Sequence, residues 1–168
     1  MTHLDMFDSN PARGRAIHLI DVENLLGTSF VMTSAVAYLQ TRYLEVVGIA
    51  PGDHVVLATG RRAALATWLG WKGGRKLLRG GVDGADRALL EVIEHEALDR
   101  RFPRVVLASG DGIFAEACAR LRAEGCSVTV VARPDSLSRQ LRLAAQDIRR
   151  LPLAPGTVRL PYAPEEAA

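Results

Sequence analysis

Short apolar runs alternate with segments of helical periodicity, and this alternation limits the folds that the chain can adopt. The apolar runs lie at residues 16–20, 54–58, 76–78, 104–108 and 127–132, and the helical segments at 34–47, 61–69, 84–101, 113–124 and 137–149. Strands that alternate with helices pair in parallel, and the helices cover both faces of the sheet. The sequence therefore predicts a three-layer α/β/α domain with a central parallel five-stranded sheet, in the order 3-2-1-4-5.

The length and composition are those of one globular domain. The chain has 168 residues, of which 48% are hydrophobic and 24% are charged. We assign residues 15–151 to the domain, 1–14 to a flexible N-terminal tail and 152–168 to a proline-rich C-terminal tail. The sequence has no apolar run of membrane-spanning length and no signal-peptide pattern at its start, so we expect a cytoplasmic protein. Cys118 and Cys126 lack metal-ligand spacing and are expected to be buried thiols.

Three aspartates lie where an apolar strand, or the turn after one, leads into a helix: Asp21, Asp86 and Asp111. The carboxyl ends of parallel strands meet at one edge of an open sheet, where ligands bind. Carboxylates gathered at one edge repel one another unless a cation lies between them. The trio therefore predicts a site for a divalent metal ion.

Each aspartate also has a structural interpretation. Asp111 could cap the helix that follows it, and Asp21 could complete the turn after its strand. Asp86 could stabilise the positive end of its helix dipole, with Asp83 as the cap. The shared edge favours the metal-site interpretation over these three separate ones. Asn24 and Ser109 are expected at the same edge, where they could orient a carboxylate or a substrate phosphate.

Three segments resemble the signature segments of the NYN branch of PIN-like nucleases: HLIDVENLL, GADRALLEVI and VVLASGDGIFAEACARLRAEGCSVTVVA. The resemblance covers residues 16–151, and it implies a PIN-like, Rossmann-like fold and a ribonuclease that uses Mg²⁺ or Mn²⁺ to cut RNA. Carried over residue by residue, it gives Asp21, Asp86 and Asp111 as catalytic and metal-binding residues, and Asn24 and Ser109 as substrate-orienting residues.

Ile113 departs from the family pattern, because it stands where the family has a second turn aspartate. An isoleucine cannot bind a metal ion, so the resemblance leaves two functions open. The first is a metal-dependent ribonuclease acting on phosphodiester bonds. The second is a catalytically weakened or inactive PIN-like module that binds RNA or a protein partner.

Residues 54–82 contain no acidic residue, although the whole chain has a net charge of only +2. Within this stretch we predict RNA contacts by Arg61, Arg62, Trp71, Arg75, Lys76 and Arg79. The cations would follow the phosphates, and Trp71 would stack on an unpaired base, whereas Trp68 is expected in the core. The alternative is a basic face that only keeps the protein soluble. The predicted partner is single-stranded RNA, and the sequence leaves a homodimer open.

Overall fold

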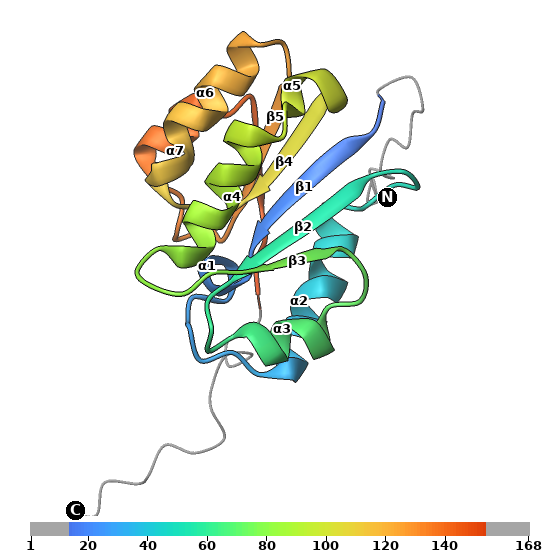
Figure 1. Ribbon diagram of the computed structural model, residues 1–168, viewed down its shortest axis with the longest axis vertical. Helices are drawn as coiled ribbons and strands as arrows, with labels where there is room; N and C mark the ends of the chain where they lie inside the picture. Colours follow the sequence, from blue (N-terminus) through green and yellow to red (C-terminus); the bar gives the residue numbers. More distant parts are fainter. Residues whose placement is uncertain (1–13, 154–168) are drawn as a thin grey trace, which may run out of the picture.

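The structure, a computed structural model, describes residues 14–153 (Figure 1). Most of each predicted tail, at 1–14 and 152–168, lies outside the described residues. None of the helices in the described range has the length and apolar character needed to span a bilayer.

All strands of the described chain form one parallel sheet in the order β3-β2-β1-β4-β5-β6. The strands are β1 Ala16–Asp21, β2 His54–Thr59, β3 Arg75–Leu78, β4 Arg104–Ala108, β5 Ser127–Ala132 and β6 Asp147–Arg150. The predicted order of the first five strands is confirmed, and a sixth strand extends it. Because β1 pairs with both β2 and β4, the chain reverses its direction of travel across the sheet at the β1–β4 junction.

Helices cover both faces of the sheet, as predicted (Figure 1). They are α1 Val22–Leu26, α2 Thr33–Val46, α3 Ala64–Gly70, α4 Gly84–His95, α5 Leu98–Arg101, the 3₁₀ helix η2 Gly112–Phe114, α6 Ala115–Ala123 and α7 Arg139–Ala144. Alternate residues of β1 point to opposite faces, so Leu19 packs in the core beneath α4 and α6, whereas Ile20 packs beneath α1 and α2. The central strand is thus buried on both sides, which explains its continuous apolar sequence.

The predicted helix at 137–149 is wrong in its second half. Helix α7 ends at Ala144, and Ala145 has an extended backbone with φ −73° and ψ 149°. The chain then forms β6, in which Ile148 is paired with Val130 of β5. Strand pairing satisfies the polar backbone groups along the outer side of β5, and this gain overrides the helical periodicity of the sequence.

The predicted helix at 84–101 is interrupted near its end. Ala97 has a positive φ of 47°, and this turn separates α4 from α5. The new direction of the chain places Leu98 and Phe102 in the core. Cys118 and Cys126 are buried free thiols, as predicted.

A buried polar network ties the start of β1 to α2. Nδ1 of His18 lies 2.8 Å from the hydroxyl of Tyr43, and its Nε2 lies 3.3 Å from Oδ2 of Asp53. The Asp53 carboxylate also accepts hydrogen bonds from the backbone N–H groups of Ala16 and Ala50. These bonds outweigh the burial that would raise the pKa of Asp53, so that pKa lies below its ordinary value, whereas burial lowers the pKa of His18.

Candidate functional site

A cleft of about 670 Å³ opens at the carboxyl edge of the sheet. Its walls come from the β1–α1 junction, the loop after α1, the β2–α3 turn and the loop between β3 and α4. The lining residues are Asp21, Glu23, Asn24, Ser29, Gly60, Arg61, Arg62, Gly80, Gly81, Val82, Asp83, Gly84, Ala85 and Asp86. Two of the three predicted aspartates therefore lie in one cleft, together with two of the predicted RNA-binding arginines.

Asp21 and Asp86 form a pair of buried carboxyl groups in this cleft, and each acts on the pKa of the other. Asp21 is 3% exposed, and Asp86, in the first turn of α4, is 8% exposed. Asp21 also caps α1, because its Oδ1 accepts a hydrogen bond of 3.0 Å from the N–H of Asn24. Among the described residues, the buried Oδ1 of Asp86 finds no hydrogen-bond partner.

Burial raises the pKa of both carboxyl groups of this pair. Burial, and then the contact with Asp86, raises the pKa of Asp21 to about 8. The pKa of Asp86 is also raised, mainly by burial and further by the negative charges of Asp111, Asp83 and Glu23. A bound cation would favour the ionised form of both carboxyl groups, because an opposite charge acts against desolvation.

Asp111 lies at the same edge but stands apart from the buried pair. It is exposed, and its Oδ1 accepts a hydrogen bond of 2.9 Å from the N–H of Ile113, so it caps η2. Its charge acts on Asp86. Within residues 14–153, no group of three or more histidine, cysteine, aspartate or glutamate side chains is arranged to hold a metal ion. The structure thus brings together a pair of aspartates and places the third within electrostatic range.

Asn24 and Ser109 shape the turns around the aspartates. The N–H of Gly110 donates a 2.9 Å hydrogen bond to Oδ1 of Asn24, which joins the end of β1 to the end of β4. Ser109 is fully buried, and its Oγ accepts a 3.2 Å hydrogen bond from the N–H of Asp111. In this structure the Ser109 hydroxyl fixes the turn that carries Asp111, and its orienting role toward a substrate stays a prediction.

Gly110 cannot carry a side chain in this turn. A Cβ atom there would lie 2.2 Å from the backbone oxygen of Ser136. The turn thus packs directly against the segment that follows β5. Ile113, in the next turn of chain, is 42% exposed and leaves the position of the family's second turn acid apolar.

Glu23 is an acid of the cleft that the sequence did not single out. Its Oε2 accepts a hydrogen bond of 2.7 Å from the N–H of Gly60, so it fixes the β2–α3 turn to α1. The only sequence signal was its place between Asp21 and Asn24. The contact joins residues far apart in the chain, and the sequence does not show which segment Glu23 meets.

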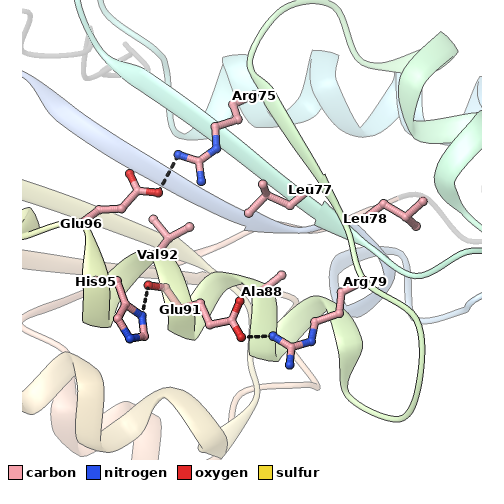
Figure 2. Close-up of a pocket in the computed structure, with 9 residues that line it drawn as sticks. All are labelled: Arg75, Leu77, Leu78, Arg79, Ala88, Glu91, Val92, His95 and Glu96. Atoms are coloured by element: carbon pink, nitrogen blue, oxygen red, sulfur yellow. Dashed lines mark hydrogen bonds and ion pairs between the residues drawn. The ribbon is translucent and has the colours of Figure 1, made fainter.

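The predicted RNA-binding cations divide between two places. Arg61 and Arg62 line the cleft, and Arg61 lies against Gly80, where a Cβ would be 2.8 Å from its Nε. Arg75 and Arg79 line a separate hollow of about 730 Å³ between β3 and α4. In Figure 2 they point toward the acids with which they form ion pairs, Glu96 and Glu91.

Lys76 lines neither place and makes a local contact instead. Its Nζ donates a hydrogen bond of 2.9 Å to the backbone oxygen of Gly73. Of the predicted cations, only Arg61 and Arg62 line the cleft that holds the buried aspartates.

The burial of the two tryptophans is the reverse of that expected. Trp71 is 1% exposed, and its ring meets that of Tyr43 edge to face at 5.7 Å between centroids. Its backbone is extended just beyond the end of α3, which turns the indole into the core between α2 and the sheet. The predicted stacking of Trp71 on a base is therefore wrong. Trp68 is 41% exposed rather than in the core.

Comparisons with known proteins support the fold and the family. The NYN domain family model matches residues 79–151, from the end of β3 through β6, and over this part of the chain the predicted resemblance to the NYN branch of PIN-like nucleases is confirmed. A crystal structure of a protein of unknown function from Vibrio parahaemolyticus RIMD 2210633 is similar in fold, with a TM-score of 0.55 and 18% sequence identity. The similarity covers 80% of this chain and 91% of that one. No curated protein gives a significant match.

Proposed function

Because residues 79–151 match the NYN domain, whose family points to a nuclease-type, RNA-related function, we propose that this protein is a metal-dependent ribonuclease. In this proposal, RNA phosphodiester bonds are hydrolysed at the cleft that holds Asp21 and Asp86. The observation that carries it is the buried Oδ1 of Asp86, which lacks a partner beside a second buried carboxyl group. Burying two carboxyl groups without full hydrogen bonding lowers the stability of the fold, and such groups are typical of functional sites, where a bound cation would compensate for the burial.

The donor set suits Mg²⁺ or Mn²⁺, which prefer carboxylate oxygens and retain several waters. Asp21 and Asp86 would hold the ion, and Asp111 would add the third negative charge at this edge. When bound, the ion supplies a Lewis acid for the phosphoryl oxygen and a water of lowered pKa. Ser109 and Asn24 would then keep the Asp111 turn and the Asp21 turn in fixed positions through their hydrogen bonds.

Arg61 and Arg62 supply the positive charge that an anionic substrate needs next to acidic residues. The Glu23 carboxylate holds the start of their turn through the N–H of Gly60. Guanidinium groups bind phosphate oxygens in pairs, so this turn is suited to the RNA backbone on either side of the bond to be cut.

The second candidate is a PIN-like module that binds RNA or a protein without cutting RNA. It is favoured by Ile113, which supplies no fourth carboxylate. It is also favoured by the separation of exposed Asp111 from the buried pair, since the described residues offer no preformed group of three ligands. Both candidates use the same cleft, and they differ in whether the bound RNA is cut.

Cleavage of a labelled single-stranded RNA in Mg²⁺ or Mn²⁺, with and without a chelator, separates the two candidates. We expect metal-dependent cleavage that is lost in Asp86→Asn and Asp111→Asn. The matched control is Asp99→Asn, an exposed acid in α5, and it should cleave as the wild type does. Binding of intact RNA without any cleavage would favour the second candidate, and equal cleavage by all variants would place the activity elsewhere.

A further inference from the structure

Phe30 is an exposed aromatic side chain in the loop between α1 and α2. It is 56% exposed, and of the aromatic side chains within residues 14–153 only Phe30 and Trp68 are exposed. Its backbone N–H donates a hydrogen bond of 3.1 Å to Oγ1 of Thr28, which fixes the turn that presents the ring. A solvent-exposed phenylalanine contributes little to folding, and its ring is accessible to a partner.

Arg62 connects this ring to the cleft. Its guanidinium carbon lies 5.1 Å from the centroid of the Phe30 ring, within the range of a cation–π contact. Arg62 lines the cleft, and so does Ser29, the residue before Phe30. The aromatic ring therefore stands at the mouth of the cleft that contains Asp21 and Asp86.

The surroundings favour an anionic partner with flat rings. Arg61 and Arg62 belong to the acid-free stretch 54–82, and Arg61 lies against Gly80, which also lines the cleft. Single-stranded RNA offers bases that stack on an aromatic ring and phosphates that pair with arginine. Guanidinium planes stack on bases as well, so Arg62 can support the same base that meets Phe30.

We propose that Phe30 and Arg62 form a subsite that stacks one base of single-stranded RNA at the mouth of the cleft, with Arg61 on an adjacent phosphate. This rests on the proposed RNA-related function and adds the residues that hold the strand. Phe30 is a positioning residue: it keeps the backbone phosphate of the stacked nucleotide beside the aspartates. It takes the role that the sequence assigned to the buried Trp71.

The test measures equilibrium binding of the full chain to a fluorescein-labelled oligouridine in chelator, with RNA integrity checked on a gel. Phe30→Ala should raise the Kd about 5- to 150-fold, the range expected for one lost base stack. Phe30→Trp should keep the wild-type affinity or improve it. Trp68→Ala is the matched control, because it removes the other exposed aromatic ring, and it should leave the Kd unchanged.

A second substrate isolates the stacking itself. With an oligonucleotide of abasic riboses, the wild type and Phe30→Ala should bind alike, because only phosphates remain to be held. Equal oligouridine binding by the wild type and Phe30→Ala would overturn the subsite, as would a loss in Trp68→Ala alone. Tighter binding to oligothymidine DNA than to RNA would overturn the assignment to RNA.

Failure of the subsite and failure of the nuclease are distinguishable. A Phe30 effect on binding with no cleavage in Mg²⁺ or Mn²⁺ supports the subsite and contradicts the nuclease. Cleavage that persists with unchanged RNA affinity in Phe30→Ala supports the nuclease and contradicts the subsite. Absence of RNA binding by the wild type in chelator contradicts the subsite, and absence of cleavage in Mg²⁺ or Mn²⁺ contradicts the nuclease.

Discussion

Asp21→Asn should make the protein more stable while it removes a proposed catalytic group. Asparagine caps a helix as well as aspartate does, so the hydrogen bond to the N–H of Asn24 can persist. The new amide can also donate to Asp86, whose buried Oδ1 has no partner among the described residues. The substitution therefore removes a buried acid and keeps the local hydrogen bonds.

The magnitude follows from proton linkage. Burial beside Asp86 raises the pKa of Asp21 from 3.8 to about 8, so the folded state holds a proton that the unfolded state releases. The resulting stability is present at low pH and is lost as pH rises from 3.8 through about 8. The slope for one proton is about 1.4 kcal/mol per pH unit. At pH 7 the variant gains on the order of 4 kcal/mol at most.

The cleanest window is pH 6.5 to 8. Burial lowers the pKa of His18 from 6.5, so this histidine adds a small slope of the opposite sign near pH 6.5, and it adds the same slope to the wild type and the variant. Across the window the wild type should lose about 2 kcal/mol of unfolding free energy relative to Asp21→Asn, because His18 and the other titrating groups are common to both proteins.

Urea unfolding in chelator at four pH values within this window, followed by tryptophan fluorescence, measures both slopes. Asp99→Asn, which removes an exposed acid from α5, should keep the wild-type slope. The reasoning is refuted if Asp21→Asn keeps the wild-type slope, or if it is less stable than the wild type at every pH.

Three further changes have expected outcomes. Trp71→Ala should lower the free energy of unfolding by about 3–5 kcal/mol in urea titrations, because it empties a buried site against Tyr43; a change below 1 kcal/mol would contradict the buried placement. Gly110→Ala should cost about 1–3 kcal/mol and reduce cleavage, because its Cβ would meet the backbone oxygen of Ser136; unchanged stability and cleavage would show that the turn can yield. Asp53→Asn should reduce the loss of stability that the wild type shows below about pH 4 in thermal unfolding. The lowered pKa of Asp53 stabilises the fold above that pH, and this stability is lost as the folded carboxylate becomes protonated. The same loss of stability in acid as in the wild type would argue against the network with His18.

The strand order was predictable because each of the first five strands is a short apolar run bounded by turn residues. The same alternation placed Asp21 and Asp111 at the carboxyl edge of neighbouring strands. Strand β6 was not predictable, since its residues continue the helical periodicity of α7 and become a strand only by pairing with β5. The local sequence pattern predicts the secondary structure of a segment unless pairing with a distant strand provides more backbone hydrogen bonds, as it does for β6.

The side chains around the cleft were harder to predict for a related reason. Trp71 lies just after the last residue of α3, where helical periodicity no longer says which way a side chain points. The contacts of Glu23 with Gly60 and of Arg62 with Phe30 join segments distant in sequence. The sequence therefore could not distinguish Arg61 and Arg62, which line the cleft, from Arg75 and Arg79, which form ion pairs with glutamates.

Strand β1 lies at the centre of the sheet but outside the segment that matches the family. The unit able to fold alone is therefore longer than the matched segment. The segment matched by the family, 79–151, holds β4, β5 and β6 together with Asp86 and Asp111, but β4 takes its inner partner from β1. Expressed alone, the segment would expose that edge of β4 to self-association and would lack Asp21. Fusions and truncations should therefore keep residue 14 through residue 153 as one unit, since half of the proposed site is contributed from outside the matched segment.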